Sequence, residues 1–172
     1  MSTTSLPDWT LDHPYSQTLA CAHGTKPYKW SVSAGTLPTG LTLKSTTGVL
    51  SGTPTVTGSF TFTATATDSV GVKGSRSYEV VINSPVTIKT TSLPNWTVNL
   101  PGYDEKISAT GGTGALTFSS FGTLPTGLTL NSTTGVLSGT PTVTGTFTFT
   151  VTATDTVGAS GSQFYEVVIN SS

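Results

Sequence analysis

The chain has 172 residues and a formal net charge of -1, and only 9% of its residues are charged, against about 25% in an average soluble protein. Its seven Lys and Arg residues are scattered, which excludes a nucleic-acid surface, since such a surface needs clustered positive charge. No apolar run approaches the ~20 residues that span a bilayer, so we expect no membrane insertion. The single cysteine, Cys21, excludes an intrachain disulfide and leaves the cellular compartment open.

Short runs of β-branched and aromatic residues, separated by turn-forming residues, predict strands along the first half of the chain. The clearest run is "SFTFTATATD", residues 59–68, in which Phe and Ala alternate with Thr. This alternation predicts a half-buried antiparallel strand whose apolar row faces a core and whose Thr row faces solvent. In chain order, the predicted strands lie near residues 9–11, 15–22, 28–33, 41–43, 49–51, 59–68 and 77–83.

Each half of the chain needs a core built without a disulfide, and aromatic residues are the candidates for it. Trp30 lies in the middle of a predicted strand, and Phe118 takes its place in the second half. Between the strands, "STTG" is typical of a tight turn, in which Gly48 and Gly135 are free to adopt a positive φ.

The second half of the chain repeats the first at an offset of 87 residues. Between residues 36–83 and 123–170, 40 of 48 positions are identical, whereas the first third of each copy differs, with one residue added before Tyr103 and one lost before Gly122. The repeat predicts two modules, residues 3–85 and 86–172, joined by a short stretch around residues 83–91 that contains one Pro. Because "TTSLP" opens each copy, Met1 and Ser2 precede a repeat start, and we expect the segment to belong to a longer chain.

About seven short strands per module, with turn residues every 8–12 positions and no helical periodicity, predict an all-β protein. The expected fold is two tandem Ig-like antiparallel β-sandwiches.

The stretches "LPTGLTLKSTTGVLSGTP" and "LPTGLTLNSTTGVLSGTP", followed by "SFTFTATATDSVG" and "SYEVVI" in the first copy, carry a family resemblance. The chain resembles the He-PIG immunoglobulin-like modules of bacterial surface proteins, which are related to dystroglycan-type cadherin-like domains, over nearly the whole of both modules. The resemblance implies an Ig-like sandwich arrayed in tandem in large secreted or cell-surface proteins. It implies an extracellular, non-catalytic structural spacer or adhesive stalk segment whose partners are neighbouring repeats.

A catalytic site is not expected from the residues either. His13 and His23 are the only histidines and have no counterparts in the second module. Cys21 and His23 stand two positions apart, and no third group that would orient them is evident, so we predict no enzyme.

Calcium is the one cofactor to weigh, because "ATDSVG" and "ATDTVG" are similar to a cadherin calcium motif. The second acid of that motif is replaced by Val70 and Val157, and each module has four acidic residues, whereas calcium takes six to eight oxygen ligands. Asp68 and Asp155 are the candidate calcium ligands. The simpler interpretation is that both carboxylates cap a turn, and we predict no cofactor.

An alternative function is a binding module for a carbohydrate or a protein partner. Trp9 and Trp96, with Tyr15 and Tyr103 after them, stand at matched places in the two modules, and Tyr28 lies in the variable first third. These five aromatic residues are the candidate ligand-binding residues. The simpler interpretation is that the matched aromatics close one end of each sandwich.

Overall fold

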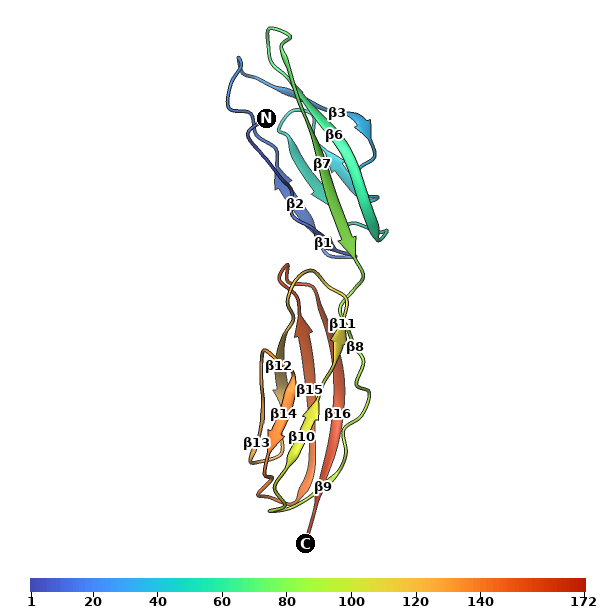
Figure 1. The fold of residues 1–172 in the computed structure, drawn as a ribbon, viewed down its shortest axis with the longest axis vertical. Helices are drawn as coiled ribbons and strands as arrows, with labels where there is room; N and C mark the ends of the chain where they lie inside the picture. Colours follow the sequence, from blue (N-terminus) through green and yellow to red (C-terminus); the bar gives the residue numbers. More distant parts are fainter. The chain divides into compact units, whose positions relative to one another are not determined.

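The computed structural model describes residues 1–172 as strands and turns, and the chain folds as two units, Met1–Ser84 and Pro85–Ser172. No helix is present that could span a membrane. Figure 1 shows the strands of each unit in sequence colours. The predicted all-β class is confirmed, and each unit is described below by itself.

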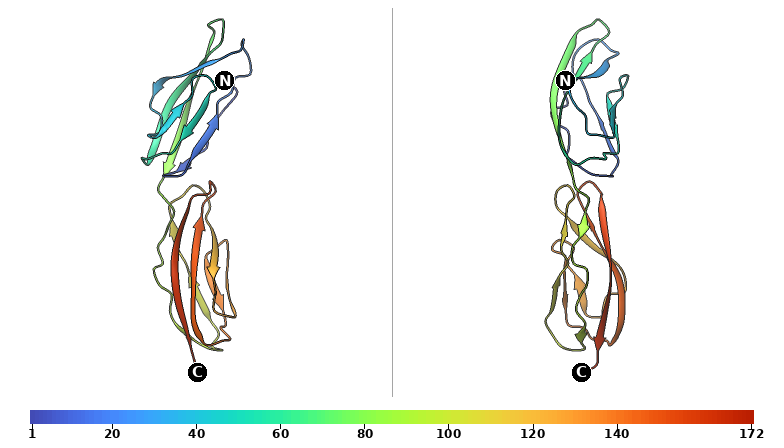
Figure 2. Two further views of the ribbon diagram at one scale, coloured as in Figure 1. Left: turned by 180° about the vertical axis from the view of Figure 1, so that it is seen from behind. Right: turned by 90° about the vertical axis from the view of Figure 1, so that its right-hand side faces the viewer.

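Unit 1 contains seven strands that follow the predicted order along the chain. They are β1 (Trp9–Thr10), β2 (Tyr15–Thr18), β3 (Lys29–Gly35), β4 (Leu41–Leu43), β5 (Val49–Gly52), β6 (Gly58–Thr67) and β7 (Lys73–Asn83). One sheet has the order β1-β7-β6-β3, and the other has the order β2-β5-β4. The right-hand view of Figure 2 shows them as two facing layers, which is the arrangement of a β-sandwich.

Unit 2 repeats this arrangement and adds one short pair of strands. Its strands are β8 (Thr87–Ile88), β9 (Trp96–Thr97), β10 (Tyr103–Lys106), β11 (Ala109–Thr110), β12 (Thr117–Gly122), β13 (Leu128–Leu130), β14 (Val136–Gly139), β15 (Gly145–Thr154) and β16 (Ser160–Asn170). The two main sheets have the orders β12-β15-β16-β9 and β10-β14-β13. The additional strand β8 pairs with β11 in an antiparallel ladder.

One pairing in each unit differs from the predicted antiparallel sandwich. The short strand β1 runs parallel to β7, with Trp9 opposite Ile82, and β9 runs parallel to β16, with Trp96 opposite Ile169. The pairing joins a strand near the start of a module to its last strand, and it brings together residues more than seventy positions apart. Alternation of residue types within one strand carries no information on such a partner.

A β-bulge explains the single residue that the second module lacks before Gly122. In unit 1, Val32 pairs with Ala64 and Ala34 pairs with Thr63, so Ser33 is the extra residue of the bulge. In unit 2, β12 pairs with β15 without interruption from Thr117 to Gly122. The bulge therefore absorbs the length difference, and Trp30 and Phe118 keep equivalent partners, Ala66 and Ala153.

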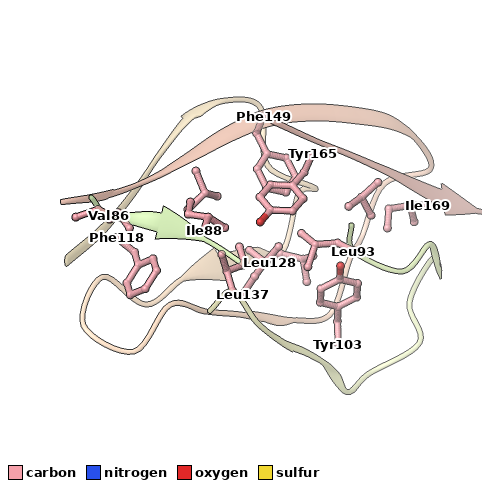
Figure 3. Packing of buried hydrophobic residues seen from close by; sticks show 14 residues of the cluster. Val86, Ile88, Leu93, Tyr103, Phe118, Leu128, Leu137, Phe149, Tyr165 and Ile169 are labelled. Carbon is pink, nitrogen blue, oxygen red and sulfur yellow. The ribbon is translucent and has the colours of Figure 1, made fainter. Parts of the chain in front are cut away.

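The apolar rows of the strands form one core in each unit. Trp30 and Phe118 are buried, as the sequence predicted, and Figure 3 shows Phe118, Phe149 and Tyr165 within the core of unit 2. The Thr rows face outward, with one exception. Thr65 is buried on the outer face of its sheet, where its hydroxyl bonds the hydroxyls of Ser33 and Ser75 at 2.8 and 2.7 Å.

Candidate functional site

The turn after β6 in unit 1 and the turn after β15 in unit 2 have the same length, and each is held by one aspartate. Asp68 accepts hydrogen bonds from the backbone N–H of Val70 and Val72 within the turn, and from the N–H of Thr25 across the end of the sandwich. Asp155 accepts the same three bonds from Val157, Ala159 and Thr113, at 3.0, 2.8 and 2.8 Å. Each carboxylate thus ties the last hairpin of its module to the variable loop of the first third.

These backbone hydrogen bonds occupy the carboxylate oxygens that a metal ion would need as ligands. The backbone N–H of Thr25, together with those of Val72, Val70 and Gly71, lowers the pKa of Asp68 below its ordinary value, because these donors favour the charged form. Three or more His, Cys, Asp or Glu side chains do not gather anywhere in the two units. The geometry is that of the turn cap that the sequence suggested, and the absence of a calcium cofactor stays a prediction.

The matched tryptophans lie against the matched tyrosines at one end of each sandwich. The Trp9 ring meets Tyr15 edge to face with centroids 5.1 Å apart, and Trp96 meets Tyr103 in the same way at 5.4 Å. Each indole N–H donates to a loop carbonyl four residues on, that of His13 or Leu100, at 3.0 Å. Each pair therefore fastens a loop onto the core, the loop between β1 and β2 in unit 1 and the loop between β9 and β10 in unit 2.

The tyrosines of these pairs are core residues rather than surface rings. Tyr15 is 2% exposed and Tyr103 is 1% exposed, so neither ring offers a face on which a ligand could stack. Burial raises the pKa of the Tyr103 phenol to about 12, and burial with the nearby Asp8 charge also raises that of Tyr15. Trp9, Trp96 and Tyr28 are half-buried and keep some exposed surface.

Tyr28 belongs to the variable loop of unit 1. Its ring packs edge-on against Trp30, with centroids 6.4 Å apart, and its hydroxyl donates to the carbonyl oxygens of His23 and Gly24 at 3.2 and 3.4 Å. The nearby Cys21 thiol contacts the Met1 sulfur at 3.6 Å. Tyr28 is thus held by contacts to its own loop, residues 23–27, and to Trp30. It is not part of the Trp9–Tyr15 pair.

Sequence reasoning missed the most exposed aromatic residues of the chain, Phe121 and Phe164. They are 85% and 58% exposed, and both stand directly across from Thr150 on the outer face of the β12-β15-β16 sheet. In unit 1 the same row holds Ala34 and Ser77 on either side of Thr63. The signal was present as the Ser77-to-Phe164 difference between the copies, but only the strand pairing shows that the two phenylalanines share a face.

The terminal strands of each module are held together by more than their short ladder. In unit 1, the Val81 N–H donates to the Asp8 carboxylate at 2.9 Å and the Tyr78 hydroxyl donates to the Thr3 carbonyl at 2.9 Å. In unit 2, Val168 donates to the Asn95 side chain at 2.8 Å and Tyr165 to the Thr90 carbonyl at 2.6 Å. We call these contacts, with the parallel ladder, the terminal clasp of each module.

A sequence model of one protein family matches both modules. The family is described as Putative Ig domain (He_PIG), and the matches cover residues 1–83 and 81–170. The chain belongs to this family. The Ig-like resemblance expected from the "LPTGLTL…STTGVLSGTP" stretches is thereby confirmed, and He_PIG modules account for both units of the structure.

Among proteins similar in sequence to these He_PIG modules is the "Serine-rich adhesin for platelets" of Staphylococcus aureus. In strain MRSA252 it is 34% identical over 108 residues, which cover 62% of this chain and 8% of the adhesin. Another S. aureus sequence of the same name is 37% identical over 109 residues, covering 62% of this chain and 5% of the adhesin. The chain therefore spans a small part of the length of these relatives.

Solved structures similar to the He_PIG chain include Ig and cadherin domains. An I-band fragment of titin, I67-I69, has a TM-score of 0.54 at 13% identity and covers 97% of this chain and 63% of its own. Extracellular cadherin domains 3-6 of protocadherin gamma B2 give a TM-score of 0.45 at 17% identity, covering 99% and 52%. The titin likeness, at this low identity, shows the tandem Ig-like fold alone.

Proposed function

We propose that the chain is a non-catalytic, tension-bearing segment of an extracellular or cell-surface stalk, in which He_PIG repeats act as spacers. The observation that carries the proposal is the terminal clasp. Because β1 and β7 are parallel and lie at opposite ends of the module's sequence, tension along the chain pulls them in opposite directions along their common axis. The ladder and the flanking hydrogen bonds are then loaded together in shear rather than opened one at a time.

Two further observations support a spacer role. Only Ser84 and Pro85 separate the last strand of unit 1 from Val86, the first core residue of unit 2, so the joint has few free residues. The turn caps, the aromatic pairs and the clasp recur residue for residue in both units, whereas the exposed faces differ. Adhesion as the role of the parent protein is part of this proposal, and its support is the similarity to a surface adhesin.

Pulling single molecules by their two ends tests the tension-bearing role. Forced unfolding reports the unfolding rate under load, so we expect two separate, high-force unfolding events per chain, one for each module. Asp8→Ala removes the carboxylate that holds the Val81 N–H and should lower the force of one event only. Asp104→Ala, an exposed acid outside the clasp, is the matched control and should leave both forces unchanged. If the unfolding force of unit 1 were the same in Asp8→Ala as in Asp104→Ala, the clasp would not be what bears the load.

Calcium is not required by this proposal, because backbone N–H groups already satisfy the Asp68 and Asp155 carboxylates. We expect thermal unfolding curves recorded with excess calcium and with EDTA to coincide for both modules. A melting temperature that rises with calcium, and loses that rise in Asp155→Asn, would instead assign the site to the metal.

The second candidate function is glycan binding through Phe121 and Phe164. Residues opposite each other in antiparallel strands lie ~4.5 or ~5.5 Å apart, so two steps place the two phenylalanines roughly 10 Å apart across Thr150. This spacing suits alternate sugar rings of an extended glycan. The surrounding hydroxyls, among them the Thr152–Ser162 pair at 2.8 Å, offer donors and acceptors to sugar hydroxyl groups. The acidic residue Glu166 lies two positions from Phe164 on the same face of β16, which favours a neutral glycan over an acidic one.

A glycan array, followed by titration of any hit, tests this second function. The double variant Phe121→Ala with Phe164→Ala should abolish a genuine hit, and it should keep the fold because both side chains are mostly exposed. Val143→Ala, at another exposed apolar residue of unit 2, is the control. Blank arrays would refute glycan binding, and loss of self-association in the double variant would assign the face to a second copy of the chain instead.

A further inference from the structure

A groove of ≈ 410 Å³ lies on unit 1 beside the first residue of the chain. Its lining includes Cys21, Ala22, Tyr28, Val72 and Gly74. The groove adjoins the turn cap, because Val72 donates its backbone N–H to Asp68, but none of these residues belongs to the terminal clasp. The groove is thus distinct from the clasp, and the equivalent position in unit 2 shows what it accommodates.

The hydrogen bonds around the groove place the two units in register. Ser2 donates to the Ala20 carbonyl at 2.8 Å, as Lys89 donates to Ser108 at 2.7 Å. The Thr3 hydroxyl accepts from the Ala20 N–H at 2.9 Å, and that of Thr90 accepts from Ser108 at the same distance. Met1 therefore stands at the position of Ile88, and the position of Val86 and Thr87 is the groove.

In unit 2 that position is filled by the chain itself. Val86 and Ile88 are buried members of the core, and Figure 3 shows Val86 directly before β8 and Ile88 on it, at one end of the core. A Cβ added to Gly161 would lie 2.2 Å from the Val86 carbonyl oxygen, and one added to Gly112 would lie 2.7 Å from the Val86 side chain. Both glycines are thus covered closely by this residue.

In unit 1 the counterpart surfaces are open. A Cβ added to Gly74, the counterpart of Gly161, would meet only the Met1 nitrogen, at 3.9 Å. Val72 is 65% exposed, whereas its counterpart Ala159 is 9% exposed. Residues Cys21 and Ala22 form no strand, although their counterparts form β11 by pairing with β8. In unit 2 the segment of Val86 and β8 covers all three of these places.

We propose that the groove of unit 1 is a strand-acceptor site for an extended segment of the Val86-Thr87-Ile88 type, supplied by the chain that leads into unit 1 from a preceding repeat. The occupant's chemistry follows from the groove: an apolar residue over Gly74, its backbone paired with Ala22, and a second apolar residue at the place of Met1. The proposal rests on the proposed stalk, because it takes the donor from a neighbouring repeat. It means that each module of such an array is completed by its own linker.

A lengthened chain tests the proposal directly. The sequence Ser-Pro-Val-Thr, copied from residues 84–87, is placed ahead of the chain together with Met1→Ile. The readout is the rate at which a thiol reagent modifies Cys21, which lines the groove and is the only cysteine. We expect the rate to fall at least tenfold, and the melting temperature of unit 1 to rise.

Two controls isolate the groove. An equally long extension with Ser in place of Val, combined with Met1→Ser, should leave Cys21 as reactive as in the original chain, as should Met1→Ile alone. Equal labelling rates for the apolar and the polar extension would overturn the proposal. In the converse experiment, Val86→Ser should lower the melting temperature of unit 2 and leave Cys21 labelling unchanged; an unchanged melting temperature would likewise count against it. The pulling experiment reads the clasp instead, so either proposal can fail alone.

Discussion

At the scale of single residues, the glycine of each "STTG" turn allows the turn backbone to lie close against the core aromatic residue. Gly48 has a φ of 72°, and a Cβ there would lie 2.7 Å from the Trp30 ring. Gly135 has a φ of 73° and faces Phe118 in the same way, at 3.0 Å. The sequence predicted the positive φ from the turn pattern. It did not predict the contact between this glycine and the aromatic ring, because Trp30 belongs to a different strand that is distant in sequence from the turn.

Replacing this glycine by alanine separates the two effects. Gly48→Ala should destabilise unit 1 by the cost of a left-handed backbone, about 1–2 kcal/mol, and by a further amount for the collision with Trp30. Gly71→Ala has a similar φ of 91° with nothing within 4 Å of the added Cβ, so it should cost only the backbone part. Urea unfolding followed by tryptophan fluorescence measures both. Equal losses in the two variants would show that Trp30 does not constrain the turn.

The buried phenols predict the response of unit 2 to alkali. Burial raises the pKa of Tyr165 from 10.0 to about 12, so the folded state binds this proton more tightly than the unfolded state. The resulting stability is fully present below pH 10 and is lost as the pH rises from 10 toward 12. Tyr165→Phe should flatten this decline, and at pH 7 it should cost about 1 kcal/mol for the hydrogen bond to Thr90. If the free energy of unfolding of unit 2 declined between pH 10 and 12 as steeply in Tyr165→Phe as in the original chain, this assignment would be contradicted.

At the scale of elements, strands could be predicted from alternation and turn residues, and their partners could not. The run 59–68 alternates along its own length, and the structure places β6 there. The β1–β7 and β8–β11 pairs each consist of two-residue ladders between distant segments, too short to show a period. Phe121 and Phe164 became a candidate site for the same reason only once the register across Thr150 was known.

The bulge in β3 is an element whose length can be tested. Deleting Ser33 should give an uninterrupted strand like β12, with Trp30 and Gly35 still opposite Ala66 and Phe62. We expect a loss of about 1 kcal/mol, chiefly the bond from Thr65 to Ser33. Deleting Thr63 from the central strand is the control, since it shifts β6 against both neighbours and should unfold unit 1. Unfolding by the Ser33 deletion as well would mean that the bulge is required for the fold.

At the scale of the whole molecule, the chain consists of two copies of one scaffold, and both copies have the turn cap, the aromatic pair and the terminal clasp. The resemblance in sequence was sufficient to predict the family and the number of modules. The distribution of differences was less informative, because the variable first third contains both the groove of unit 1 and Phe121 of unit 2, which call for different partners. The stalk role remains the proposal that unites these features.

Small-angle X-ray scattering of the chain in dilute solution tests that role most directly, since a spacer has to hold its ends apart. A single compact globule of this length would have a radius of gyration of roughly 16 Å. For a spacer we expect a value well above this, a distance distribution with a long tail, and the same profile with calcium and with EDTA. A radius near that of a compact globule, or an extended profile that depends on calcium, would contradict it.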